Sequence, residues 1–119
     1  MTKILLVDDD PASSGLLKMF LEFETFEVLI ARNLEYARKA LDQSIGIVLL
    51  DIHLSRNESG LVLLDEIRTG KTDAAEDIPV VVTSGDDRET QSVLDQGANA
   101  FMYKPFPPSQ LVEKIHELL

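Results

Sequence analysis

Carboxylates directly follow two apolar runs of the sequence. Asp8, Asp9 and Asp10 come after Lys3–Val7, and Asp51 comes after Ile47–Leu50. Carboxylates that lie close together repel one another unless a cation intervenes. Because the chain has no cysteine and only 2 histidines, oxygen atoms dominate its potential metal ligands. Oxygen ligands suit a hard cation, so this pattern indicates a site for Mg²⁺ or Mn²⁺.

A hydroxyl and an amine directly follow two further apolar runs. Thr83 follows the valine run 80–82, and Lys104 follows the short run Ala100–Tyr103. A metal with open positions, a lysine ammonium and a hydroxyl can together hold a phosphoryl group. One carboxylate could then act as the nucleophile and form an aspartyl phosphate.

Each of these residues also has a purely structural explanation. The three consecutive aspartates could cap a helix, although Asp10-Pro11 alone meets that need. Thr83 could be an ordinary β-branched strand residue, and Lys104 could be a surface lysine. The functional interpretation therefore depends on all of them meeting at one place.

The apolar runs predict five strands. They have little polar alternation, which is typical of strands buried on both faces of a parallel sheet. The runs are Lys3–Val7, Phe26–Ala31, Ile47–Leu50, Val80–Val82 and Ala100–Tyr103.

Amphipathic stretches between these runs predict helices. Asp10 and Asn33 are expected N-caps, whereas Gly70 and Gly97 are expected helix ends. The last helix is expected from about residue 109 to residue 119. For the first helix we expect an apolar face made of Leu16, Leu17, Phe20 and Leu21.

Alternation of strands and helices predicts an α/β fold. Five β-α units with short connections give one doubly wound parallel sheet with right-handed crossovers and helices on both faces. In such sheets the functional crevice lies beyond the carboxyl ends of the strands. Convergence of the first, third, fourth and fifth strand ends would bring the acids, the hydroxyl and the amine together.

Composition narrows the classes of function. A chain of 119 residues is the usual size of one domain, here 1–119. The absence of cysteine fits a reducing cytoplasm, where we expect the protein. The net charge of −10 disfavours direct nucleic-acid binding. No run approaches the ~18 apolar residues that a membrane span needs.

Four segments together resemble the response-regulator receiver domain of two-component signalling, over essentially the whole chain. They are KILLVDDDP at 3–11, IVLLDIHL at 47–54, PVVVTSG at 79–85 and GANAFMYKPF at 97–106. This resemblance implies a (βα)5, flavodoxin-like sheet with strand order 2-1-3-4-5.

The resemblance also implies how the acidic residues act. Asp51 would accept a phosphoryl group from a phosphohistidine on a sensor histidine kinase or phosphotransfer protein, or from a small acyl phosphate. Mg²⁺ would be held by Asp9, Asp51 and the backbone carbonyl of His53, with Asp8 acting mainly through water. Such a domain catalyses its own phosphorylation and dephosphorylation but turns over no free substrate in the ordinary sense.

Further roles follow from the same resemblance. Thr83 would hydrogen-bond the phosphoryl group, and Lys104 would pair with it. The Lys104–Pro105 peptide bond would be cis. Phe101 would be the switch aromatic on the fifth strand, where many relatives have tyrosine, while also packing in the core.

The loop that follows Asp51 departs from the family pattern. Ser55 stands where a proline is usual, and loop 52–59 is one residue longer than usual. His53 is either an exposed loop histidine or a residue that tunes autodephosphorylation, because it lies two positions after the acceptor. Pro107-Pro108 replaces the more typical capping Ser or Thr of the last helix.

Other functions are compatible with parts of the pattern. A pseudo-receiver would bind partners without being phosphorylated, but such modules usually lose an acid or the lysine. An aspartyl phosphatase typically has a second acid where this chain has His53. A flavin carrier would need a phosphate cradle where Asp8–Asp10 lie. The sequence leaves the output open: an effector domain, a downstream protein or a homodimer, for which residues 88–95 are candidates.

Overall fold

Five short strands form a single parallel sheet in the computed structural model, which describes residues 1–119. The order across the sheet is β2-β1-β3-β4-β5, as expected for a doubly wound flavodoxin-like fold. Every neighbouring pair is parallel. The strands are β1 (Lys3–Val7), β2 (Glu27–Ala31), β3 (Ile47–Asp51), β4 (Val80–Ser84) and β5 (Ala100–Tyr103).

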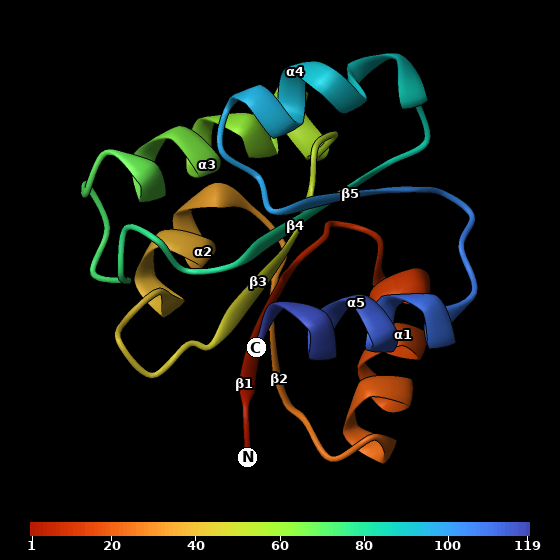
Figure 1. Cartoon of the computed structure of the whole chain (residues 1–119). Coiled ribbons are helices and arrows are strands. Elements are labelled where there is room, and N and C mark those ends of the chain that lie inside the picture. Colours follow the sequence, from red (N-terminus) through yellow and green to blue (C-terminus); the bar gives the residue numbers. More distant parts are fainter.

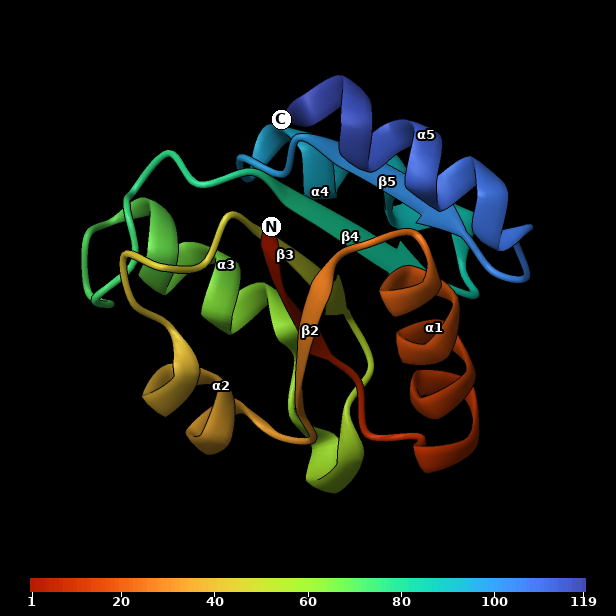
Figure 2. The same ribbon diagram turned by 90° about the horizontal axis from the view of Figure 1, so that it is seen from below.

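Helices cover both faces of this sheet (Figure 1). They are α1 (Pro11–Phe23), α2 (Leu34–Ala40), α3 (Gly60–Arg68), α4 (Thr90–Asp95) and α5 (Pro108–Leu118), with short 3-10 helices η1 (Ser55–Asn57) and η2 (Asp87–Glu89). Helices α1 and α5 lie together on one face, and α2, α3 and α4 lie on the other (Figures 1 and 2). None of these helices has the length and apolar character that crossing a bilayer requires.

Successive strand residues point to opposite faces and so build two cores. In β1, Leu5 and Val7 belong to a cluster of 20 buried residues that includes side chains of α2, α3 and α4. Ile4 and Leu6 belong to a second cluster of 11 buried residues, with side chains of α1 and α5. This arrangement explains why the strands lack polar alternation.

The helix ends follow the expected cap chemistry. The side chain of Asp10 accepts a hydrogen bond from the Ala12 N–H at 3.0 Å, and that of Asn33 accepts one from the Tyr36 N–H at 2.9 Å. Helix α5 begins at Pro108, one residue before the expected start, and has no side-chain cap. Proline suits a first helical position because its missing N–H would be unpaired there.

The expected apolar face of α1 is partly wrong. Leu21 is buried and Leu17 packs against the second core, but Leu16 is 70% exposed. Ser14, which is fully buried, takes the place on the inner face that we expected an apolar side chain to fill. The spacing of Ser14, Leu17 and Leu21 follows the helical period, so α1 buries only a narrow stripe.

Candidate functional site

The predicted site residues meet at the carboxyl end of the sheet. In the register between strands, Asp51 at the end of β3 lies opposite Thr83 in β4. The Asp8 N–H, just beyond β1, donates to the Ala31 carbonyl at 3.1 Å, and the Lys104 N–H, just beyond β5, donates to the Ser84 carbonyl at 2.8 Å. Parallel pairing thus brings residues that are far apart in the sequence to one edge.

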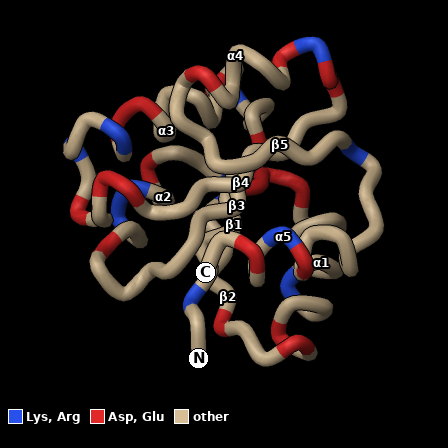
Figure 3. The backbone as a smooth tube through the Cα atoms, in the orientation of Figure 1, with Lys and Arg blue, Asp and Glu red and all other residues tan.

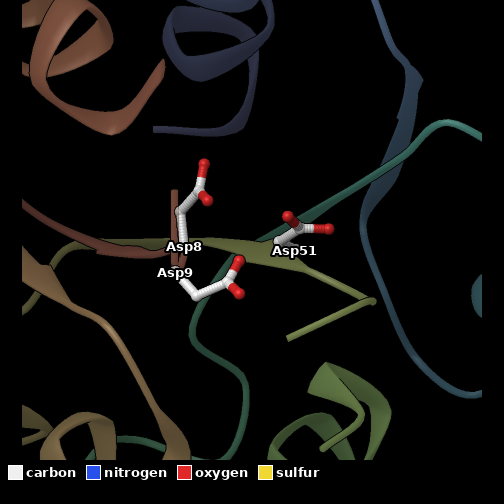
Figure 4. Close-up of side chains that lie close together, drawn as sticks. All are labelled: Asp8, Asp9 and Asp51. Atoms are coloured by element: carbon white, nitrogen blue, oxygen red, sulfur yellow. The ribbon is translucent and has the colours of Figure 1, made fainter. Parts of the chain in front are cut away.

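Three carboxylates converge there. One oxygen from each of Asp8, Asp9 and Asp51 lies within 4.8 Å of the other two. Figure 4 shows the side chains of Asp8, Asp9 and Asp51 close together. Acidic residues are also spread around the rest of the molecule (Figure 3), so it is this spacing, more than the net charge, that distinguishes the cluster.

Asp51 is held by two donors. The Lys104 ammonium lies 3.0 Å from Oδ2, and the backbone N–H of His53 donates to Oδ1 at 3.2 Å. The residue is only 9% exposed. Gly60 lies so near that a Cβ atom there would collide with the Asp51 carbonyl oxygen, so the start of α3 must approach Asp51 closely.

Asp8 is buried beside Asp51. Burial raises the pKa of its carboxyl group above the ordinary value, and the neighbouring charge of Asp51 acts in the same direction. The Asp10 N–H, at 2.9 Å from Oδ1, and the Ser13 hydroxyl, at 3.3 Å from Oδ2, oppose this rise, as does the charge of Lys104.

The arrangement fits a hard divalent cation. Three carboxylates face one lysine ammonium, so the site carries an excess of negative charge. All the ligand atoms are oxygens, which suits Mg²⁺ or Mn²⁺. The His53 side chain turns away, with Nε2 3.6 Å from the Glu89 carboxylate, so His53 could contribute only its backbone carbonyl.

The neighbouring residues of β4 and β5 lie as expected. Thr83 is 7% exposed and borders Asp51. Phe101 is partly buried and packs against the larger core. The Lys104–Pro105 peptide bond is cis, as the resemblance implied. The geometry thus makes Thr83 a neighbour of Asp51 in the sheet and places the Lys104 ammonium 3.0 Å from the Asp51 carboxylate.

The loop after Asp51 makes contacts that sequence reasoning missed. The Ser55 hydroxyl donates to Oδ2 of Asp9, and the carboxylate of Glu58 accepts the N–H of Leu34 at 3.3 Å. Arg56 and Asn57 both have positive φ, at 62° and 59°. Although Ser55 stood out as an unusual residue, nothing in the sequence pointed to its partner.

Comparison with known proteins agrees with this geometry. The model of the response regulator receiver domain matches residues 4–116. The transcriptional regulatory protein CpxR of Klebsiella pneumoniae is 38% identical over 122 residues, which span 100% of this chain and 50% of that protein. The chain therefore spans about half the length of these curated relatives.

Solved structures give the same result. A CheY-like receiver domain protein of Methanospirillum hungatei superposes with a TM-score of 0.85 at 30% identity, over 98% of this chain and 92% of that one. TrrA of Thermotoga maritima, solved with Mg²⁺ and BeF, superposes with a TM-score of 0.83 at 32% identity, over 100% of both chains. The chain thus belongs to the response regulator receiver domain family of two-component systems.

Proposed function

We propose that the chain is a phosphoacceptor that takes a phosphoryl group onto Asp51 from the phosphohistidine of a sensor histidine kinase or phosphotransfer protein. The observation that carries this proposal is the buried Asp51 carboxylate, paired with Lys104 at 3.0 Å and bordered by Asp8 and Asp9. A non-phosphorylated pseudo-receiver is less well supported, because this chain keeps every residue that such a module usually loses.

A divalent cation, Mg²⁺ or Mn²⁺, would be held by the carboxylates of Asp9 and Asp51 and by the backbone carbonyl of His53, with Asp8 acting mainly through water. When bound, it would offset the charge of the carboxylates and of the phosphoryl oxygens. The relative TrrA was solved with Mg²⁺ and BeF, which supports this assignment.

The residues of the chain would orient the transfer. An oxygen of Asp51 forms a bond to phosphorus while the phosphorus–nitrogen bond of the donor breaks and its electron pair returns to the histidine ring. Lys104 holds the Asp51 carboxylate in place and pairs with the phosphoryl oxygens. The hydroxyl of Thr83 donates a hydrogen bond to the group once it is attached.

A groove beside the acceptor offers a place for the donor protein. It has a volume of about 580 Å³, and its lining includes Asp8, Lys104 and three apolar residues of α1, Leu16, Leu17 and Phe20. The exposed Leu16 extends this apolar surface. We propose that the donor packs here, because the groove combines apolar contact area with direct access to the acidic cluster.

The names of the relatives suggest what phosphorylation of this domain controls. CpxR and SrrA are named as transcriptional regulatory proteins, and this chain covers 50% and 47% of their lengths. We propose that phosphorylation of this domain controls an effector domain or a separate downstream protein, rather than nucleic acid directly.

Binding of a phosphoryl mimic tests the proposal. With Mg²⁺ and beryllofluoride, the amide resonances of Thr83 and Phe101 should shift in a two-dimensional NMR spectrum. In an Asp51→Asn variant, adding beryllofluoride to the Mg²⁺-containing sample should not shift Thr83 and Phe101, because the carboxylate that holds the mimic is gone. Equal shifts in the two proteins would refute Asp51 as the acceptor.

A further inference from the structure

Ser55 contacts the acidic cluster from a different segment of the chain. Its hydroxyl donates a hydrogen bond to Oδ2 of Asp9, although 46 positions separate the two residues. Ser55 begins η1, within the loop between β3 and α3. The contact therefore joins the loop that follows the phosphoacceptor to a potential metal ligand beyond β1.

The backbone of this loop fixes Ser55 in place. The Leu54 N–H donates to the Glu58 carbonyl at 3.1 Å, and the Glu58 N–H donates to the Ser55 carbonyl at 3.2 Å. An isolated bridge between His53 and Ser59 closes the base of the loop. Because the turn is closed on itself, its first residue presents the hydroxyl from a defined position.

A second anchor ties the loop to α2. The carboxylate of Glu58 accepts the N–H of Leu34 at 3.3 Å, at the start of that helix. The loop is thus attached at its base, to α2 and to Asp9, and Ser55 is not a freely rotating surface serine.

The other two carboxylates of the cluster are held by different donors. Asp8 accepts from the Asp10 N–H and the Ser13 hydroxyl, and Asp51 accepts from Lys104 and the His53 N–H. For Asp9, which is less buried than these two, the hydrogen bond comes from Ser55.

The contact leaves Asp9 available to a cation. While Ser55 donates to Asp9, an oxygen of Asp9 still lies within 4.8 Å of oxygens from Asp8 and Asp51. An ionised carboxylate has about four acceptor positions on two oxygens, so one hydrogen bond does not fill it. The hydroxyl thus orients Asp9 toward the cluster rather than withdrawing it.

We propose that Ser55 is a positioning residue that preorganises Asp9 for Mg²⁺ and raises the preference of the site for Mg²⁺ over Ca²⁺. This inference rests on the proposed cation site. Partners that orient a metal ligand contribute about 10-fold to 100-fold in metal affinity. Mg²⁺ demands near-ideal octahedral geometry, whereas Ca²⁺ accepts flexible coordination, so a loosened Asp9 penalises Mg²⁺ more.

Calorimetric titration of the metal-free protein with MgCl₂ and with CaCl₂ tests the proposal. A Ser55→Ala variant should bind Mg²⁺ about 10-fold more weakly, with a smaller loss for Ca²⁺. A Ser55→Thr variant keeps the hydroxyl and should retain most of the Mg²⁺ affinity. The thermal midpoint of metal-free Ser55→Ala should match that of the parent, because Ser55 is exposed.

Ser44 provides a matched control. Its hydroxyl also donates to an aspartate, Asp42, but on an exposed turn that contributes nothing to the acidic cluster. The Ser44→Ala variant should bind Mg²⁺ like the parent, which separates loss of positioning from loss of any serine–aspartate contact.

The outcomes separate this inference from the proposed function. A parent protein that binds no Mg²⁺ would overturn the proposed cation site and the inference with it. If the parent binds Mg²⁺ and Ser55→Ala binds it equally well or more tightly, only the positioning role is overturned. Equal losses for Mg²⁺ and Ca²⁺ would overturn the claimed selectivity.

Discussion

Two polar clusters lie at opposite ends of the same sheet and are built in opposite ways. At the amino end, the guanidinium of Arg68 donates to the Gly97 carbonyl at 2.9 Å, the Glu76 carbonyl at 2.7 Å and the Asn99 side chain at 2.9 Å. At the carboxyl end, the carboxylates of Asp8, Asp9 and Asp51 converge, and the ammonium of Lys104 pairs with Asp51.

The two clusters differ in whether their charged groups find enough partners of opposite charge or hydrogen-bonding partners within the protein. At the amino end, the guanidinium of Arg68 donates to three oxygen acceptors and needs no further partner. The Asn99 oxygen among them also accepts the Val80 N–H at 2.8 Å, where β4 begins. Three acids with one base leave charge that only an added cation can offset. The amino-end cluster therefore stabilises the fold, whereas the carboxyl-end cluster opposes folding while no cation is bound and is the site proposed for phosphorylation.

Removing Arg68 should have the largest effect on stability. In an Arg68→Ala variant, two backbone carbonyls and the Asn99 amide lose charge-assisted hydrogen bonds, so the free energy of unfolding should fall by about 3 kcal/mol. Urea denaturation measures this change. The exposed pair of Arg38 and Glu66 is the control, and Arg38→Ala should cost less than about 1 kcal/mol.

Mg²⁺ affinity shows whether the two ends are independent. At urea concentrations at which the Arg68→Ala variant is still folded, it should bind Mg²⁺ with the same affinity as the parent. A parallel loss of metal affinity would show that the amino-end cluster shapes the site and would remove the contrast between the two ends.

Neutralising Asp8 should have the opposite effect on stability. In an Asp8→Asn variant, the free energy of unfolding in metal-free buffer at neutral pH should rise, because a buried charge next to Asp51 is removed. The amide oxygen can still accept the Asp10 N–H that now bonds Oδ1. The variant should bind Mg²⁺ more weakly, because one carboxylate is lost.

The pKa of Asp8 also sets a pH dependence for the parent protein. Because the folded-state pKa is raised above the ordinary 3.8, the folded state binds more protons than the unfolded state between these two values. The contribution of Asp8 to stability is therefore full below the ordinary pKa and is lost as the pH rises through the raised one. Asp8→Asn should remove this dependence, as denaturation at several pH values would reveal; identical pH profiles would contradict the burial argument.

Backbone strain should give the smallest effect. Thr25, in the amino-end turn between α1 and β2, is an exposed β-branched residue with a φ of 70°. A Thr25→Gly variant removes the strain of this backbone conformation but increases the entropy of the unfolded chain. We therefore expect a net stabilisation of about 0.5 kcal/mol. Thermal denaturation measures it, and a lower midpoint would show that the Thr25 side chain contributes more than its strain costs.

The sequence predicted the carboxyl-end cluster better than the amino-end one. Asp51, Thr83 and Lys104 could be located because each follows an apolar run, and parallel strands bring such positions to one edge. The strand order and the cis peptide followed from the resemblance to receiver domains. No local pattern marks Arg68, since its three acceptors come from loops whose positions depend on the complete fold.

The sequence also did not predict which side chains of loops and helix faces make contacts. Leu16 looked like a core residue from its spacing, but Ser14 is buried on the inner face of α1 together with the predicted Leu21, while Leu16 is exposed. Ser55 was recognised as unusual, yet its contact with Asp9 depends on how the turn closes after β3. Periodicity describes an element, whereas these contacts depend on how elements meet.

Phosphorylation of Asp51 tests the account most directly. The protein is incubated with Mg²⁺ and acetyl phosphate, and its intact mass and a peptide map are then recorded. We predict a mass increase of one phosphoryl group on the peptide that contains Asp51, lost when Mg²⁺ is chelated before the reaction and absent in Asp51→Asn. A parent protein that stays unmodified, or an Asp51→Asn variant modified to the same extent, would contradict the assignment of the carboxyl-end cluster as a phosphoacceptor site.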